Sequence, residues 1–287
     1  MDIKQITTVE SGQDGAIYKN LLFRFGSRGK CRVYDLSTEC DDPMTVRECM
    51  AEFMLDRAEE IAPHSNAVFF GTEKYCEDDE LPLLYSNIYN NYAKCPERRV
   101  GMLCVYRIER CEGGFKSTLV QLIEIGFKDE RGLWLSEGDT EDVRPFGNFV
   151  MDKDEGKLYA FVMRDGDKST RYFAFDMPKL TDGEIDRELN VRKVTLAQTD
   201  IKEYFDTPYH RYVQGACMRA GLIYSTEGFG KSIHPAIRVI DTAKREQVFF
   251  LDFFEAGYEH EAEFIDFYGD RCLYSDAKGN VFELTLD

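Results

Sequence analysis

Short apolar segments separated by turns recur along the whole chain, and most of them alternate apolar and polar residues. An apolar run rich in tyrosine, a turn and a second, alternating run occur together five times. Alternation places successive side chains on opposite faces of a strand, so each pair of runs predicts a β-hairpin. The first strands are expected at residues 21–23, 83–86, 158–160, 222–225 and 272–275, and the second at 31–36, 102–108, 172–177, 237–241 and 281–284.

A further apolar run precedes each hairpin, and a fourth strand is expected after four of the five hairpins. The leading runs are residues 16–18, 67–70, 149–151, 216–218 and 264–267, and the fourth strands are expected at 49–55, 119–125, 193–197 and 247–253. The fifth repeat has only three strands. Because residues 4–9 also alternate and belong to no repeat, we expect them to supply its outer strand.

Four antiparallel strands repeated around an axis, with the last sheet completed by the N-terminal strand, predict an all-β, five-bladed β-propeller. Residues 1–287 would form a single domain, with blades starting near residues 14, 65, 148, 214 and 263 and insertions near 86–100 and 128–146. A β-sandwich or two smaller all-β domains would also suit short strands with frequent turns. Residues 45–61 contain many strong helix formers, but we expect a strand followed by a loop there.

Charge and cysteine content restrict the partners and the compartment. Asp and Glu number 53 against 36 Lys and Arg, which gives a net charge of −17. A nucleic acid or an anionic membrane is therefore an unlikely partner, because phosphate binders present basic surfaces. No signal peptide or apolar run of about 20 residues is visible. The nine cysteines form no Cys-x-x-Cys pair, which indicates reduced, mostly structural thiols in a cytoplasmic protein.

Polar residues precede every predicted inner strand, and in a propeller these positions face the funnel at one end of the axis. We expect the ligand-binding residues to be His64, Asn66, Asn148, Gln214, Glu263, His210 and His260. Gln13, Asp14 and Glu261 occupy related positions. The alternative is that these side chains only bond backbone groups and water around a narrow axis.

Two chemical hypotheses follow from the same set. His64, His210 and His260 could converge with Glu261 or Glu263 on a transition metal, because imidazole and carboxylate are suitable ligands. No spacing motif supports such a site, so we predict neither a metal nor another cofactor. Paired carboxylates could instead act as general acid and base, as in glycoside hydrolysis, with Asp14, Glu261 or Glu263 as candidates.

The fourth repeat resembles a blade of the plant-type glutamine cyclotransferases. The resemblance lies in Val213-Gln214-Gly215, in residues 222–228 (Leu-Ile-Tyr-Ser-Thr-Glu-Gly) and in residues 237–241 (Ile-Arg-Val-Ile-Asp). It implies a five-bladed propeller that cyclises N-terminal glutamine with a funnel carboxylate. Glu227 stands two places after the position of that family's glutamate, where this chain has Ser225, and the tryptophans of that family's pocket are absent. Residues 263–274 are similar to blades of uncharacterised bacterial propellers.

The sequence favours a binding module, whose funnel takes a small polar ligand or a peptide segment. The alternative is a funnel enzyme of cyclotransferase-like or glycosidase-like type, in which Glu263 or Glu227 would be essential for turnover. A protein partner would instead use exposed aromatic residues in the insertions, with Tyr89, Tyr92 and Trp134 as the candidates.

Overall fold

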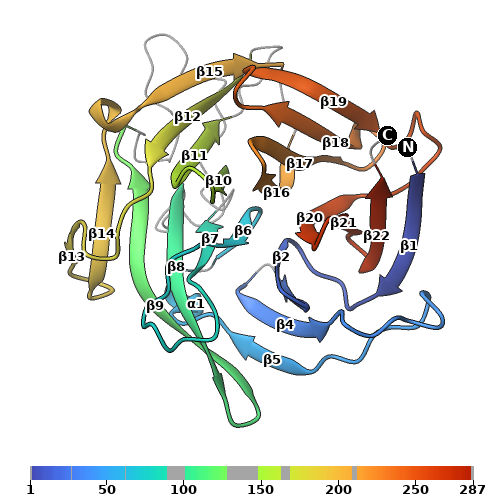
Figure 1. Cartoon of the computed structure of the whole chain (residues 1–287), viewed down its shortest axis with the longest axis horizontal. Coiled ribbons are helices and arrows are strands. Elements are labelled where there is room, and N and C mark those ends of the chain that lie inside the picture. The colour runs from blue at the N-terminus through green and yellow to red at the C-terminus, as the bar shows by residue number, and fades with distance from the viewer. Residues whose placement is uncertain are drawn as a thin grey trace.

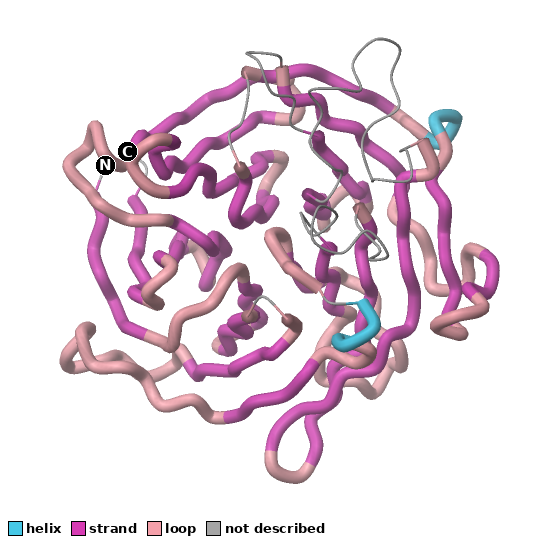
Figure 2. Tube along the Cα trace, turned by 180° about the vertical axis from the view of Figure 1, so that it is seen from behind, coloured by secondary structure: helices cyan, strands magenta, loops and turns pink. Residues whose placement is uncertain are grey.

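The computed structural model describes residues 2–26, 28–61, 63–88, 101–127, 148–162, 169–208 and 212–285. Five β-sheets stand around a central axis as the blades of a propeller (Figure 1). The predicted all-β, five-bladed propeller is therefore confirmed. Figure 2 shows the ring from behind, where helix is confined to short segments such as α1 (Ala58–Ile61).

The strands of each blade follow one another from the axis to the rim. In that order, blade 1 contains β2 (Gly15–Tyr18), β3 (Leu21–Phe25), β4 (Lys30–Asp35) and β5 (Ala51–Met54). Blade 2 contains β6 (Val68–Phe70), β7 (Leu84–Ile88), β8 (Met102–Cys111) and β9 (Gly114–Ile125). Blade 3 contains β10 (Asn148–Asp152), β11 (Lys157–Val162), β12 (Thr170–Asp176) and β15 (Glu203–Thr207). Blade 4 contains β16 (Val213–Arg219), β17 (Leu222–Phe229), β18 (Ile233–Asp241) and β19 (Glu246–Asp252).

Blade 5 is closed by the start of the chain, as the sequence predicts. It contains β20 (Ala262–Tyr268), β21 (Arg271–Asp276), β22 (Asn280–Thr285) and β1 (Asp2–Thr8). Strand β1 runs antiparallel to β22, with Asp2 opposite Thr285 and Thr8 opposite Asn280. Arg47, in the connection between β4 and β5, holds β1 in place, because its backbone N–H donates to the carbonyl of Thr8 over 2.7 Å. The ring therefore has no open end.

The outer strand predicted at residues 193–197 for the third blade is wrong. Those residues belong to β14 (Val191–Leu196), which runs parallel to β9 and, with β13 (Glu184–Asp186), extends blade 2 to six strands. The side chain of Leu196 is buried in the cluster between blades 2 and 3. The true outer strand of blade 3 is β15, where Phe205 stacks on Tyr172 with ring centroids 5.1 Å apart.

The segment at residues 45–61 contains the predicted strand, β5, and then the single-turn helix α1 in place of part of the expected loop. Ala58 and Ile61 are the buried residues of this helix, so packing fixes the turn. Of the predicted insertions, residues 89–100 and 128–146 lie outside the described ranges.

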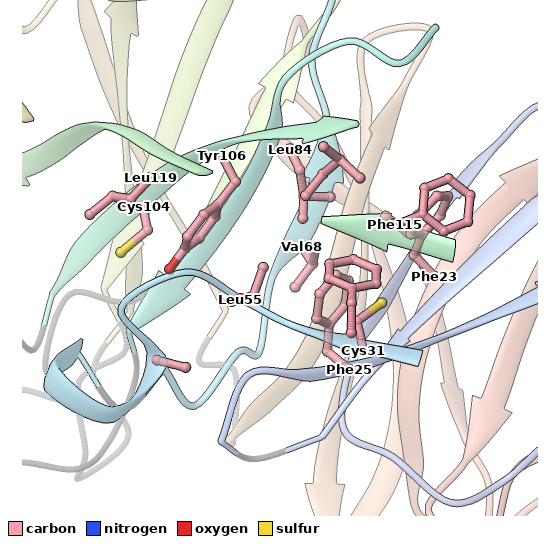
Figure 3. Close-up of a cluster of buried hydrophobic side chains, with 14 of the residues drawn as sticks. Phe23, Phe25, Cys31, Leu55, Val68, Leu84, Cys104, Tyr106, Phe115 and Leu119 are labelled. Carbon is pink, nitrogen blue, oxygen red and sulfur yellow. The ribbon is translucent and has the colours of Figure 1, made fainter. Parts of the chain in front are cut away.

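The hydrophobic core lies between neighbouring blades, because both faces of each sheet are covered. Figure 3 shows the cluster between blades 1 and 2, in which the rings of Phe23 and Phe115 lie 5.5 Å apart. On β3, Phe23 and Phe25 enter this cluster, whereas Leu22 packs on the opposite side against blade 5. The alternation along each strand thus serves two cores, and it also fixes which polar side chains face the axis.

Candidate functional site

The inner strands β2, β6, β10, β16 and β20 surround the axis at close range (Figure 1). Little space is left near the beginnings of these strands, as the surroundings of Gly215 on β16 show. A Cβ atom at Gly215 would lie 2.5 Å from the carbonyl oxygen of Glu263 and 3.0 Å from Oδ1 of Asp14. Blades 1, 4 and 5 therefore meet at this point, and only glycine allows the approach.

Asn66 and Gln214 are brought together across the axis, as the prediction of a shared site requires. The side-chain nitrogen of Asn66 donates to the carbonyl of Val213 over 2.9 Å and lies 3.5 Å from Oε1 of Gln214. The backbone N–H of Asn66 donates to Oδ1 of Asn87 over 2.7 Å. Asn66 is buried and links blade 2 to blade 4, whereas Gln214 is partly exposed.

The carboxyl groups of Asp14 and Glu263 are buried at the same axial end. Oδ2 of Asp14 accepts a hydrogen bond of 2.7 Å from the backbone N–H of Val68. Burial raises the pKa of Asp14 well above its usual range. Burial also raises the pKa of Glu263 to about 7, although the Arg24 guanidinium acts in the opposite direction. Oδ1 of Asp14 and Oε2 of Glu263 have no hydrogen-bond partner among the described residues.

Arg24 completes this group, although the sequence-based prediction did not include it. Its side chain is 2% exposed, and Nη2 donates to the carbonyl of Gly12 over 2.8 Å and to that of Asp276 over 3.4 Å. Nε and Nη1 have no acceptor within the described part of the chain. Burial lowers the pKa of Arg24 to about 10, while the charges of Glu263 and Asp14 raise it. We call Asp14, Arg24 and Glu263 the Arg24 cluster.

The available signal for Arg24 was its place in the run Leu21-Leu22-Phe23-Arg24-Phe25. A charged residue inside an otherwise apolar strand is rarely buried unless it has polar partners, so it marks a polar position within a core. The prediction covered only residues ahead of the inner strands. Arg24 lies instead on the second strand, directly opposite Gly15 of β2.

Asn148, predicted at the start of the third blade, is fully buried. Both polar atoms of its side chain lack a hydrogen-bond partner among the residues that the structure describes. Within the same residues, its side chain therefore makes no hydrogen bond to the Arg24 cluster. Asn148 is thus a separate buried polar group on β10.

The predicted histidines do not share one environment. His260 packs among aromatic rings, 4.5 Å from Phe282 and 5.6 Å from Tyr258 between ring centroids, and its burial lowers the pKa of the imidazole. Its Nδ1 lies 3.9 Å from Oδ2 of Asp276. His64 is half-buried ahead of β6, and His210 lies outside the described ranges. Within those ranges, no group of three or more His, Cys, Asp and Glu side chains could hold a metal ion.

Glu227, the carboxylate suggested by the resemblance to cyclotransferases, lies in a buried ion pair. Its Oε1 is 2.6 Å from Nη2 of Arg238, and its Oε2 accepts from Nε of Arg238 over 3.3 Å. The pair joins β17 to β18 within blade 4. Glu227 therefore has a structural role. Ser225, two residues earlier on the same strand, has a buried hydroxyl group without a hydrogen-bond partner among the described residues.

Two remaining expectations concern the surface. The aromatic patch predicted from Tyr89, Tyr92 and Trp134 lies outside the described ranges. In the part of the chain that the structure describes, no helix has the length and apolar character needed to cross a bilayer.

Comparison with known proteins finds only distant similarities among solved structures. No family model matches the chain, and no curated protein matches it. Among solved structures, the glutaminyl cyclase of Myxococcus xanthus is 12% identical with a TM-score of 0.46, over 100% of this chain and 95% of that one. A PQQ-bound aldose sugar dehydrogenase from Streptomyces coelicolor is 12% identical with a TM-score of 0.47, over 98% and 97% of the two chains. The sheet topology makes the chain a five-bladed β-propeller, and its similarity to the glutaminyl cyclase is weak.

Proposed function

We propose that this propeller is a binding module that takes a small polar ligand or a peptide segment at the axial end, above the Arg24 cluster. Gln214 and Glu261 are partly exposed there, next to the buried groups of the cluster. One observation carries the proposal. Arg24 is buried with two nitrogen atoms that have no acceptor among the described residues, and one carboxyl oxygen each of Asp14 and Glu263 has no hydrogen-bond partner there.

The energetic reason is the cost of leaving buried polar groups unpaired. Each such group costs about 1–3 kcal/mol, and charged groups cost more. A bound group that accepts from Arg24 and donates to Glu263 or Asp14 would remove this cost in the folded state. Ordered water could fulfil the same need, so the experiment has to distinguish a ligand from water.

Native mass spectrometry of gently desalted protein tests for a co-purifying ligand. We expect an added mass on the wild-type chain that is lost in Arg24→Met and retained in Arg32→Met. Arg32 is a matched control, because it lies on the neighbouring strand β4 and pairs with Glu10 and Glu52 at the surface. A wild-type chain without added mass, together with a crystal structure showing only water at the Arg24 cluster, would contradict the proposal.

The second candidate function is a funnel enzyme, favoured by the pKa of about 7 at Glu263. A carboxyl group that titrates near neutral pH can serve as a general acid or base. The assays are cyclisation of peptides with N-terminal glutamine and hydrolysis of nitrophenyl glycosides. Turnover that disappears in Glu263→Gln and persists in Glu246→Gln, an exposed control on β19, would support catalysis. Absence of turnover on both substrate classes counts against these two activities.

A further inference from the structure

A pocket opens beside the proposed axial site, between blades 4 and 5. Its volume is about 240 Å³, and its lining includes Pro235, Phe254, His260, Glu261, Asp276 and Ala277. We call it the His260 pocket. It is large enough for one apolar side chain, but it is smaller than the pockets of about 300–1,000 Å³ that bind drug-sized molecules.

The walls of the His260 pocket are apolar on one side. Pro235 is buried and Phe254 is half-buried, and the Phe254 ring lies 4.9 Å from the ring of His234. The ring of His260 is held by its aromatic neighbours, and burial lowers its pKa, so it adds a neutral aromatic wall at pH 7. Such a surface gains free energy when an apolar group displaces water from it.

The rim of the same pocket is polar and mostly acidic. Glu259, Glu261 and Asp276 contribute three carboxylates, whereas Lys231 and Lys278 contribute two ammonium groups. The chain as a whole carries a net charge of −17. A cationic group is therefore favoured next to this rim, and an anionic one is repelled.

The His260 pocket and the Arg24 cluster adjoin each other in blade 5. Asp276 lines the pocket, and its backbone carbonyl accepts the hydrogen bond from Arg24. Glu261 lines the pocket and stands two residues before Glu263. A ligand in the pocket therefore lies next to residues that hold the Arg24 cluster.

We propose that the ligand of the axial site is a peptide segment that inserts one apolar side chain into the His260 pocket and places a Lys or Arg beside Glu261 and Glu263. This inference rests on the proposed binding function and narrows it to peptides. The apolar and basic side chains of such a peptide match the wall and the rim of the pocket.

Selection from a random heptapeptide phage library tests the inference. We expect the wild-type propeller to enrich peptides in which Lys or Arg stands within two residues of a large apolar residue. Synthetic peptides of the enriched sequence, labelled with fluorescein, then give affinities by fluorescence anisotropy. Ala277→Phe fills the pocket and should weaken binding about tenfold or more. Glu261→Lys should weaken the same peptides, with a smaller salt dependence than the wild type shows.

The matched control is Ala243→Phe, which puts the same ring on an exposed turn of blade 4 and should leave the affinity unchanged. Circular dichroism and thermal unfolding confirm that each variant is folded. No enrichment over the naive library, or equal affinities for wild type and Ala277→Phe, would overturn the peptide inference. The mass-spectrometric comparison of Arg24→Met with Arg32→Met does not involve this pocket. It therefore tests the binding proposal separately, whatever the peptide experiment shows.

Discussion

Asp14 and Val68 join two blades through one hydrogen bond, in which the backbone N–H of Val68 donates to Oδ2 of Asp14 over 2.7 Å. Asp14 directly precedes the inner strand of blade 1, whereas Val68 begins the inner strand of blade 2. A side chain from one blade therefore provides the acceptor that the first strand residue of the next blade needs. Asn66 links blade 2 to blade 4 through another hydrogen bond, in which its side-chain nitrogen donates to the carbonyl of Val213.

Removing the carboxyl group of Asp14 should destabilise the ring. In Asp14→Ala the buried N–H of Val68 loses its acceptor, so the free energy of unfolding should fall by about 1–3 kcal/mol. Urea denaturation measures the change. Asp154→Ala, at an exposed turn of blade 3, is the control and should change stability by less than about 0.5 kcal/mol. Equal stability of the two variants would show that water replaces the carboxyl group at no cost.

The pH dependence of stability should reveal Glu263. Its pKa in the folded protein is about 7, whereas that of an exposed Glu is about 4.3. Between these values the folded state binds more protons than the unfolded state, so stability falls as pH rises from about 4.3 to 7. The loss from this one group is about 4 kcal/mol and is complete above pH 7.

Glu263→Gln removes this titration, so the difference in unfolding free energy between variant and wild type should grow across that pH range and then level off. Denaturation series at half-unit steps of pH measure it. Glu246→Gln, at an exposed position of β19, is the control with a flat difference. A flat difference for Glu263→Gln as well would mean that the Glu263 carboxyl is solvated as an exposed one is.

Gly215→Ala should strain the meeting point of three blades. The added Cβ would lie 2.5 Å from the carbonyl oxygen of Glu263, a backbone atom that cannot move away by rotation. We expect a loss of about 1–3 kcal/mol of stability, as for other overpacked sites. Gly26→Ala is the control, because its Cβ would approach no atom closer than the Lys30 carbonyl oxygen at 3.7 Å. Thermal unfolding of both variants decides whether the axis is as tight as the structure indicates.

The Glu227–Arg238 pair should matter for folding and not for ligand binding. Glu227→Ala leaves the Arg238 guanidinium buried without its partner, which typically costs about 3–5 kcal/mol. The exposed pair of Arg110 and Glu80 is the control, and Glu80→Ala should cost less than about 1 kcal/mol. Replacing Glu227 and Arg238 together by Leu and Met should recover much of the loss. A folded Glu227→Ala of normal stability that no longer retains its ligand would contradict this assignment.

The sequence predicted the propeller because each blade repeats the same alternation and the two chain ends complement each other. It could not place β14, because alternation records that a segment is extended and not which sheet it joins. Residues 191–196 pair in parallel with β9 of the preceding blade, whereas residues 203–207 complete blade 3. The distinction depends on Phe205, whose burial against Tyr172 is a tertiary contact.

The candidate site was predictable only where its residues precede inner strands. That rule selected Asn66, Gln214 and Glu263, and the structure brings Asn66 and Gln214 to within 3.5 Å of each other. Arg24 was not found, because its neighbours in sequence are all apolar and its partners come from blade 5 and from Gly12. His260 satisfied the rule, yet its ring also packs on Tyr274 of β21 and Phe282 of β22, which its sequence neighbours do not reveal.

Because β1 pairs with β22, blade 5 cannot be completed until β22 has been synthesised. The partner of Thr8, Asn280, is made about 270 residues after it, which takes roughly 15–55 seconds at translation rates of about 5–20 residues per second. During that interval the alternating segment at residues 2–8 has an unpaired edge, the kind of strand that is prone to join other chains. We expect the charged side chains of Asp2 and Lys4 to oppose such pairing until the partner strand exists.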